Sequence, residues 1–381
     1  MDFSLSQEQL DLRAGVIRFA NRELNDDVLQ RDARGEFSRS LWEKCARFGI
    51  QGLPIPEQYG GSARDALSTI LAMEALGYAC KDNGLLFSLN AQMWSFELPV
   101  LKFGRDDQKA SFLPRLCDGS MIGVQAMTEP GSGSDAFSLS TTAEKKGDVY
   151  VLNGSKAFVT NAPVADAFLV FAKTDPGKDF AGISAFIVER HLPGLSVSTE
   201  QHKLGLRTSP MGELGFQDCG VPDAYLLGTP GAGMTIFNSS MDWERTCILA
   251  CAVGTMQRQV ERCIQYARER TQFGQPIGKF QAVSHRIVDM KVRLETARLL
   301  LYRVGWLKAN GKRTSAESAM AKLYISECFV QSSLDAVQVH GGYGYMEEFE
   351  LARELRDAVG SRIYSGTSDI QKNIIAGGLG L

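Results

Sequence analysis

The chain has 381 residues, of which 44% are hydrophobic, and its formal net charge is −3. A chain of this length exceeds what one hydrophobic core usually supports, so we expect two or three packed sub-domains. The charge excludes a general nucleic-acid-binding protein, which needs a basic footprint, and no apolar run is long enough to span a bilayer.

Residues 1–120 are predicted to form an N-terminal helical domain. Ser6 and Gln9 have the spacing of a helix-capping box, and the apolar residues from Leu10 to Leu24 follow one helical stripe. Prolines and glycines interrupt the pattern between residues 54 and 61. Further helices are predicted over residues 40–48, 66–80, 84–101 and 106–117.

Residues 121–232 change in character and are predicted to form a middle β domain. Short runs of β-branched and aromatic residues alternate there with Gly, Pro, Asn and Asp, which is typical of an antiparallel sandwich or barrel. The predicted strands cover residues 149–152, 168–172, 183–188 and 213–218.

Residues 233–381 return to helical patterns and are predicted to form a C-terminal helical domain. Long helices are predicted over residues 235–272, 281–310 and 314–339, and a last helix begins near Thr367. A β module between two helical ones is an α+β arrangement.

The cysteine spacing and the glycine motifs limit which metal and nucleotide sites the chain can contain. The eight cysteines form no Cys-x-x-Cys, and none of the four histidines lies near Cys247 and Cys251, so we expect buried free thiols and no metal site. Gly231-Ala232-Gly233 lacks a third glycine, and no Walker A sequence occurs. Any dinucleotide must therefore be bound without a Rossmann unit.

A glycine- and hydroxyl-rich tract, residues 125–135, opens the middle domain with the sequence Gln-Ala-Met-Thr-Glu-Pro-Gly-Ser-Gly-Ser-Asp. Such a loop lets backbone N–H groups approach an anionic or heteroaromatic ligand closely. By itself it is equally consistent with a surface turn between domains. A second tract, Gln338-Val339-His340-Gly341-Gly342, follows a predicted helix, where paired glycines also serve as a C-cap.

These two tracts, in this order and separation, resemble the two signatures of the acyl-CoA dehydrogenase superfamily, and the resemblance spans essentially the whole chain. It implies an N-terminal helical domain, a middle antiparallel β domain and a C-terminal four-helix-bundle domain. It also implies FAD as the cofactor. Members of this superfamily use a glutamate to take the α-proton of an acyl thioester, while the flavin accepts a hydride from the neighbouring carbon.

The resemblance assigns cofactor-binding residues in two groups, of which the first surrounds the flavin. Phe158 takes a slot often filled by Trp, although an aromatic residue in a strand is usually part of the core, and Thr160 is expected near the reactive nitrogen. The other members are Gln125, Met127, Thr128, Gly133 and Ser134, and Ser134 is also expected near the thioester arm.

The second group is expected to hold the adenine-diphosphate end of FAD, in part from a neighbouring subunit. Arg270 suits this role because a guanidinium matches a pyrophosphate. Thr367 and Asp369 open a helix whose N-terminus favours phosphate, although Asp369 occupies a slot often filled by Gln or Glu. The other members are Gln272, Phe273, Gln281, Gln338, Val339, Gly341 and Gly342.

Ser365 stands where most members of the superfamily carry the catalytic glutamate, and an unaided serine hydroxyl is far too weak a base to replace it. In Asp242-Trp243-Glu244-Arg245, Glu244 matches the position at which a minority of members, of the isovaleryl and long-chain types, place their base. From the residues alone, Glu244 is also consistent with a charge near a helix start. The resemblance favours Glu244 as the general base, with Arg245 orienting it or supporting the loop over the substrate.

The substrate is expected to contact Ser134, Arg245, Tyr364, Ser365 and Gly366, with a backbone N–H near Ser365 in an oxyanion hole for the thioester carbonyl. A serine at 365 also removes bulk and charge from the pocket wall. The pocket is therefore expected to have room for a branched or cyclic acyl group.

Short strings, among them residues 161–166, 239–245 and 365–371, resemble the prolyl-carrier-protein dehydrogenases and oxidases of natural-product pathways. That resemblance implies oxidation of L-proline held as a phosphopantetheine thioester on a carrier protein. Two alternatives stay open. One is a short- or branched-chain, isovaleryl-like acyl-CoA dehydrogenase with the same base, and the other is a non-catalytic flavin-binding scaffold.

The expected partners follow from the same resemblance. They are an aminoacyl-carrier protein or an acyl-CoA as substrate carrier, oxygen or an electron-transfer flavoprotein as electron acceptor, and further copies of the chain in a homotetramer. The N-terminus lacks the plan of a secretion signal, so a cytoplasmic location is expected, with no nucleic-acid or membrane partner.

Overall fold

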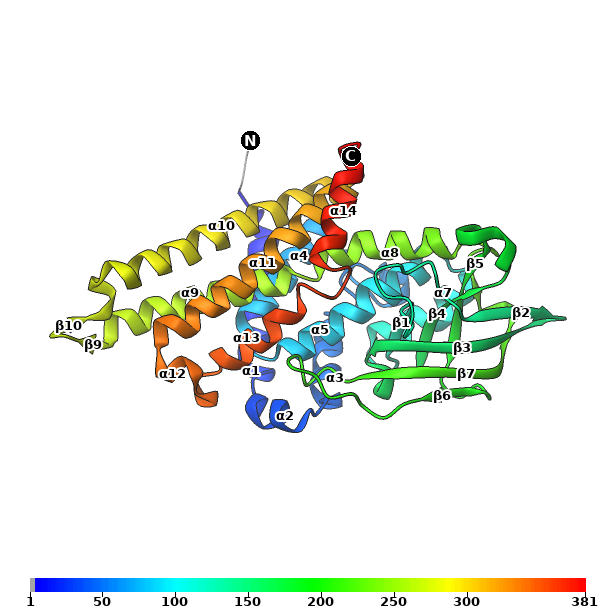
Figure 1. Cartoon of the computed structure of the whole chain (residues 1–381), viewed down its shortest axis with the longest axis horizontal. Coiled ribbons are helices and arrows are strands. Elements are labelled where there is room, and N and C mark those ends of the chain that lie inside the picture. The colour runs from blue at the N-terminus through cyan, green and yellow to red at the C-terminus, as the bar shows by residue number, and fades with distance from the viewer. Residues whose placement is uncertain (1–3) are drawn as a thin grey trace.

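The computed structural model describes residues 4–381 and shows three parts packed together (Figure 1). N-terminal helices lie in the middle and the β-sheet lies at one end. A hairpin of β9 (Thr271–Gln272) and β10 (Gln275–Pro276) marks the opposite end, where the long C-terminal helices turn. The α+β arrangement predicted from the sequence is confirmed.

The N-terminal part begins with α1 (Gln7–Glu23), whose predicted capping box is confirmed. The Ser6 hydroxyl accepts a hydrogen bond from the Gln9 N–H, and the Gln9 side chain accepts one from the Ser6 N–H. The helices that follow are α2 (Val28–Arg34), α3 (Arg39–Phe48), α4 (Ala66–Ala79), α5 (Asn83–Gln92), α6 (Leu98–Phe103) and α7 (Asp106–Cys117).

The single helix predicted over residues 84–101 is interrupted, because a π-helical turn, Met93–Glu97, joins α5 to α6. Pro99 provides the physical reason. Proline has no N–H to donate to the carbonyl of Ser95, four residues earlier, and its ring crowds that carbonyl. A wider turn relieves the crowding, and such turns are frequent at functional sites.

An eight-stranded sheet forms the middle part, in the order β6-β7-β3-β2-β4-β5-β8, with β1 beside β4. The four predicted strands are confirmed as β3, β4, β5 and β7. The strands are β1 (Gly123–Ala126), β2 (Thr142–Lys146), β3 (Val149–Thr160), β4 (Ala167–Lys173), β5 (Ile183–Glu189), β6 (Leu195–Val197), β7 (Met211–Pro222) and β8 (Leu226–Leu227).

The sheet is mixed, where the sequence predicted antiparallel pairing throughout. β1 runs parallel to β4, because β1 enters the sheet directly after α7 and no hairpin turn joins it to β4. β4 and β5 are buried on both faces, and their side chains alternate between two hydrophobic clusters. This explains why both strands are continuous apolar runs.

The C-terminal part differs from prediction at its first helix. The helix predicted over residues 235–272 breaks at Ile248 and Leu249, which are both buried, and its last two residues belong to the hairpin. No Gly or Pro marks this break, so it depends on packing rather than local sequence. The helices are α8 (Gly233–Cys247), α9 (Ala250–Glu269), α10 (Gln281–Ala309), α11 (Ser315–His340), α12 (Gly342–Tyr345), α13 (Leu351–Gly360) and α14 (Ser368–Gly378).

Short 3-10 turns connect several of these elements, at Glu57–Tyr59, Ala162–Val164, Pro176–Gly182, Asp223–Tyr225, Ile277–Lys279 and Glu347–Phe349. All eight cysteines are buried and free, as predicted. Over residues 4–381, no helix combines the length and apolar character needed to cross a membrane. Within the same residues, no group of three or more His, Cys, Asp or Glu side chains is placed to hold a metal ion.

Helices α4 and α9 cross in close contact because each contributes a glycine. A Cβ atom added to Gly254 of α9 would lie 2.1 Å from the Glu74 carbonyl oxygen, and one added to Gly77 of α4 would lie 2.1 Å from the Cys251 carbonyl oxygen. This crossing fixes the C-terminal bundle against the N-terminal helices. It therefore also fixes α8, which leads directly into α9.

Gly254→Ala is expected to lower the free energy of unfolding by about 1–3 kcal/mol, because its methyl group would press against backbone that cannot rotate away. Gly15 of α1 has no atom within 4 Å of its added Cβ position. Gly15→Ala should therefore be neutral or stabilise the protein by up to ~1 kcal/mol, the helix preference for alanine. Urea unfolding measures both, and equal stability of the two variants would contradict the close crossing.

Candidate active site

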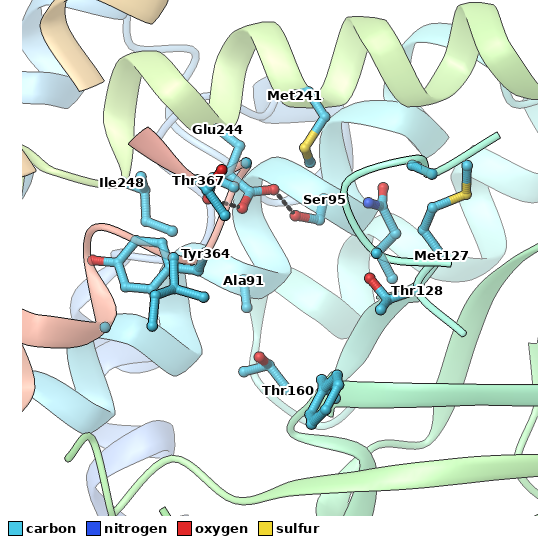
Figure 2. Close-up of a pocket in the computed structure, with 18 of the residues that line it drawn as sticks. Ala91, Ser95, Met127, Thr128, Thr160, Met241, Glu244, Ile248, Tyr364 and Thr367 are labelled. Carbon is cyan, nitrogen blue, oxygen red and sulfur yellow. Dashed lines mark hydrogen bonds between the residues drawn. The ribbon is translucent and has the colours of Figure 1, made fainter. Parts of the chain in front are cut away.

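A cavity of about 1130 Å³ lies where the three parts of the chain meet. Its walls come from α5 and the π turn, the loop after β1, the end of β3, α8, and the turn between α13 and α14. Figure 2 shows α8 above the cavity, with the β-sheet on the opposite side. Thirteen residues predicted to bind substrate or cofactor line it: Gln125, Met127, Thr128, Gly133, Ser134, Phe158, Thr160, Glu244, Arg245, Tyr364, Ser365, Gly366 and Thr367.

Glu244 places its carboxylate in this cavity from the last turn of α8, so it is not a charge at a helix start. Its side chain is buried, with 8% of its surface exposed. The hydroxyl of Ser95 donates a hydrogen bond to Oε2 at 2.5 Å, and the hydroxyl of Ser365 donates one to Oε1. Both carboxylate oxygens are therefore held by hydroxyl groups (Figure 2).

Ser95 is a site residue that the sequence reasoning missed. It lies in the π turn that Pro99 imposes, so its hydroxyl reaches Glu244 across 149 positions of sequence. The one local signal was Pro99 inside an otherwise helical pattern, which predicts a kink four residues upstream. Nothing in the sequence shows that the kink faces the cavity.

The turn at Ser365 and Gly366 has two consecutive residues with positive φ, of 56° and 88°. Arg245 Nε donates to the Ser365 carbonyl oxygen at 3.2 Å, and Lys322 Nζ donates to the Gly366 carbonyl oxygen at 2.8 Å. Gln371 Nε2 donates to both, at 3.1 and 2.8 Å. Arg245 thus holds the backbone of the turn.

The hydrogen bonds to these two carbonyl oxygens also fix the N–H groups of Gly366 and Thr367. The reason is that the C=O and N–H of one trans peptide group point in opposite directions. Over residues 4–381, the N–H groups of Ser365, Gly366 and Thr367 donate no hydrogen bond to the protein. All three residues line the cavity. The turn can therefore accept a carbonyl oxygen from a ligand.

Lys322 is a second residue that sequence reasoning missed. It lies on α11 with its side chain fully buried, and burial, reinforced by the nearby charge of Arg245, lowers the pKa of its ammonium group to about 8. Its hydrogen bond to Gly366 satisfies the charge and fixes the turn. In the sequence it is one lysine in an ordinary helical pattern.

The loop after β1 is built on a buried ion pair between Glu129 and Lys156, whose Oε1 and Nζ atoms lie 2.8 Å apart. Lys156 also donates to the Met127 carbonyl oxygen at 3.1 Å, and Glu129 accepts hydrogen bonds from the N–H and hydroxyl groups of Ser140 and Thr141. Burial opposes ionisation of Glu129, but the charge and hydrogen bonds of Lys156 and the two hydroxyl residues outweigh it and lower its pKa to about 2. These contacts set the shape of the loop that carries Thr128 and Ser134.

Phe158 projects from β3 into the cavity because a bulge redirects it. The pairing of β3 with β7 shifts register between Lys156 and Val159, and Phe158 has a φ of +54°. Its side chain is 62% exposed, so it is not the ordinary core aromatic that the sequence also allowed. The hydroxyls of Thr128 and Thr160 face the same space (Figure 2), and over residues 4–381 neither makes a hydrogen bond.

The wall around Glu244 is mainly apolar. Ala91, Met241 and Ile248 line it, and the ring of Tyr364 lies 4.6 Å from that of Phe87, centroid to centroid. Burial raises the pKa of the Tyr364 hydroxyl well above its usual value. In the view of Figure 2, Ile248 and Tyr364 lie on one side of Glu244, and Met127 and Thr128 lie on the other.

Asp357 of α13 anchors another wall of the cavity. Its carboxylate accepts hydrogen bonds from the Leu206 N–H at 2.6 Å and from Asn83 Nδ2 at 3.1 Å, so one side chain joins all three parts of the chain. Burial raises the pKa of Asp357 to about 6, against the opposing charge of Arg353. This contact holds the segment from Lys203 to Leu206 along the cavity.

The remaining predicted cofactor residues do not line the cavity of this chain. Most cluster at the far end of the helical bundle, near the β9–β10 hairpin (Figure 1): Arg270, Gln272, Phe273, Gln281, Gln338, Val339, Gly341 and Gly342. There the Arg270 guanidinium lies 5.7 Å from the centroid of the Tyr343 ring, and Phe273 is 92% exposed. Asp369 points to solvent, where it pairs with Lys372 at 3.1 Å.

Comparisons with known proteins place this geometry in context. Three descriptions match nearly the whole chain: "Acyl-CoA dehydrogenase, N-terminal domain" over residues 6–120, "Acyl-CoA dehydrogenase, middle domain" over residues 124–219, and "Acyl-CoA dehydrogenase, C-terminal domain" over residues 231–380. An L-prolyl peptidyl-carrier-protein dehydrogenase of Serratia sp. is 45% identical over 381 residues, which cover 100% of this chain and 99% of that one.

Two solved structures are similar along their full length. The crystal structure of the prolyl acyl carrier protein oxidase AnaB superposes with a TM-score of 0.98 at 49% identity, covering 99% of this chain and 100% of that chain. A structure of PigA with FAD and proline superposes with a TM-score of 0.98 at 44% identity, covering 100% of both chains.

Replacing Glu129 with Gln is expected to lower the free energy of unfolding by about 3–5 kcal/mol, because the buried Lys156 would lose its counter-charge. The double variant Glu129→Gln/Lys156→Met removes both charges and should recover much of that loss.

The stability that Glu129 contributes also depends on pH, because its pKa is lower in the folded chain than its ordinary 4.5. The contribution is present above pH 4.5 and is lost as the pH falls from 4.5 towards about 2. Urea unfolding from pH 7 down to pH 3 measures both effects. If the loss of unfolding free energy in the double variant equals the sum of the losses in the two single variants, the pair is not coupled.

Proposed function

Because the chain belongs to the acyl-CoA dehydrogenase family, we propose that it dehydrogenates an L-prolyl group held as a thioester on a peptidyl carrier protein. In this proposal FAD is the cofactor and Glu244 is the general base. The full-length similarity to an L-prolyl peptidyl-carrier-protein dehydrogenase and to the AnaB and PigA structures supports the substrate. The observation that carries the chemistry is the buried carboxylate of Glu244, held in the cavity beside Ser365.

Glu244 performs the proton transfer in this reaction. Its carboxylate accepts the proton from the substrate Cα, and the two serine hydroxyls hold the carboxylate in one position, so little reorganisation is needed. The apolar wall of Ala91 and Ile248 excludes water from the proton that is transferred. FAD bound in the cavity would supply the hydride acceptor for the ring carbon next to Cα, and loss of the proton and the hydride would leave a double bond between the two carbons.

The cavity fits a flat heteroaromatic cofactor. An exposed aromatic ring, Phe158, faces the same space as the hydroxyls of Thr128 and Thr160, which make no hydrogen bond within residues 4–381. A planar ring system with polar edges can satisfy all three. The residues that would hold the flavin end are Gln125, Met127, Thr128, Gly133, Ser134, Phe158 and Thr160. The residues that would hold the other end are Arg270, Gln272, Phe273, Gln281, Gln338, Val339, Gly341, Gly342, Thr367 and Asp369.

The thioester carbonyl fits the turn at Ser365 and Gly366. The N–H groups of residues 365–367 are unpaired within residues 4–381, and two of them, those of Gly366 and Thr367, share peptide groups with carbonyls held by Arg245, Lys322 and Gln371. A donor fixed in this way stabilises the negative charge that grows on the carbonyl oxygen when the α-proton leaves. A serine at 365 also leaves more room for a five-membered ring than a glutamate would.

We further propose that the active unit is a homotetramer, in which a second copy brings the far end of its helical bundle to the cofactor. Along α10, Val288, Val292, Leu299 and Trp306 are each more than half exposed and lie four or seven residues apart, which places them on one helical stripe. A second copy of the chain would cover this apolar stripe.

We also propose a cytoplasmic location for the protein. The reduced cofactor would pass its electrons to oxygen or to an electron-transfer flavoprotein.

Incubation of the FAD-loaded protein with an L-prolyl-loaded carrier protein is expected to remove two hydrogens from the prolyl group, or four if the ring is oxidised to a pyrrole. Mass spectrometry of the intact carrier measures the loss. Glu244→Gln should slow it by roughly 10²–10⁴-fold, because a positioned general base contributes that much. Glu57→Gln, at an exposed position outside the cavity, makes the same kind of substitution as the control and should keep its activity.

Isovaleryl-CoA provides the competing substrate in that experiment. An unchanged prolyl carrier together with oxidised isovaleryl-CoA would replace the proposed function with that of a branched-chain acyl-CoA dehydrogenase. Bound FAD that neither substrate reduces would instead favour a non-catalytic flavin-binding scaffold.

Arg270→Ala is expected to weaken FAD binding by roughly ten- to a hundredfold, because a charge-assisted hydrogen bond to a phosphate would be lost. Fluorescence titration of the apoprotein with FAD measures the affinity, and light scattering measures the mass of the assembly. Arg47→Ala, at an exposed position of α3, serves as the control. Unchanged FAD affinity in the Arg270 variant, or full FAD affinity in a monomer, would contradict the role of the second copy.

A further inference from the structure

Two serine hydroxyls flank the carboxylate of Glu244 in a wall that is mainly apolar. Ser95 reaches Oε2 from the π turn, and Ser365 reaches Oε1 from the turn before α14. The neighbouring wall consists of Ala91, Met241, Ile248 and the ring of Tyr364 (Figure 2). A base for a purely hydrocarbon acyl group needs only an apolar wall around it, so the hydroxyl pair calls for a separate explanation.

Each hydroxyl oxygen still has lone pairs with which to accept a hydrogen bond. Over residues 4–381, no N–H or O–H group donates to Ser95 Oγ or to Ser365 Oγ. Ser95 is only 6% exposed. A ligand that fills the cavity must therefore supply the missing donors, or it leaves buried acceptors unpaired at a cost in binding.

The substrate atoms bonded to Cα come within reach of these oxygens. Cα must approach the Glu244 carboxylate for the proton to transfer, and Ser95 Oγ lies only 2.5 Å from one of its oxygens. In a prolyl group one of those atoms is the ring nitrogen, which carries one N–H when neutral and two when protonated. In an isovaleryl or cyclopentanecarbonyl group all of them are carbon and donate nothing.

We propose that Ser95 and Ser365, on either side of Glu244, form a polar subsite for the amine nitrogen on the substrate Cα, and that this subsite selects α-aminoacyl thioesters over hydrocarbon acyl thioesters. The inference rests on the proposed function and deepens it, since it names the hydroxyl oxygens that would accept a hydrogen bond from the substrate amine. Ser95 becomes a specificity-determining residue, and the serine at 365 gains a role beyond making room.

Hydroxyl groups suit this position for a second reason. A hydroxyl donates to the carboxylate while Glu244 is ionised and accepts from it once Glu244 carries the substrate proton. The two serines therefore hold the base before and after the step while still offering lone pairs to the substrate.

The test compares L-prolyl and cyclopentanecarbonyl thioesters on the same carrier protein, because the two rings differ in the nitrogen alone. The ratio of their kcat/KM values, measured with the FAD-loaded protein, reports recognition of the nitrogen. Ser95→Ala is expected to lower the prolyl preference roughly ten- to a hundredfold, the effect of one lost hydrogen bond to a buried group. Ser365→Gly provides an independent variant that removes the other hydroxyl at a position whose φ of 56° suits glycine.

Ser318→Ala is the matched control, because the Ser318 hydroxyl is also buried but bonds to Thr246, at 2.7 Å, outside the cavity. Its substrate ratio should equal that of the wild type. If Ser95→Ala and Ser365→Gly slow both substrates equally, the hydroxyls only hold Glu244 and the subsite is overturned, while the proposed function stands. If the wild type oxidises isovaleryl-CoA and leaves both carrier-bound rings unchanged, the proposed function and the subsite both fail.

Discussion

The carboxylate of Glu244, held between two hydroxyls, is the interaction on which the rest of the site depends. Ser95 comes from the N-terminal helices, Glu244 from α8 and Ser365 from the turn before α14, so no two of them share a local structure. The carboxylate is in position only when these three segments pack together. The glycine crossing of α4 and α9 brings them together, because it fixes the bundle that follows α8 against the helices that carry Ser95.

Several buried charged side chains donate hydrogen bonds to backbone carbonyl groups around the cavity. Lys322 and Arg245 hold the carbonyls of the turn at Ser365 and Gly366 from behind, and Lys156 holds the Met127 carbonyl while it pairs with Glu129. Each contact offsets the cost of burying a charge and fixes a peptide group whose opposite face is the cavity wall. The cavity therefore presents rigid backbone N–H groups and small hydroxyls, which suit a carbonyl oxygen and the edge of a heteroaromatic ring better than mobile charged side chains would.

A single copy of the chain holds only part of the predicted cofactor site. The flavin-facing residues line one cavity, whereas Arg270 and the glycines at 341 and 342 lie at the other end of the bundle, beyond the N-terminal helices (Figure 1). The exposed apolar stripe of α10 runs along the helix that connects these two regions. Assembly and cofactor binding are therefore linked in the proposed function, since the same helical bundle would provide both the contact between copies and the missing cofactor residues.

The sequence by itself determined the three-part α+β plan and most of the helices and strands, and it predicted the flavin-facing tract and Glu244 as the base. These depend on local signals, such as the Ser6–Gln9 capping box and the apolar runs of β4 and β5, or on short motifs. The tertiary structure alone decided the break after α8, the parallel entry of β1 and the roles of Ser95, Lys322 and Asp357. A serine, a lysine or an aspartate in a helix looks the same in sequence whether it faces solvent or a cavity, because what distinguishes them is contact with residues more than forty positions away.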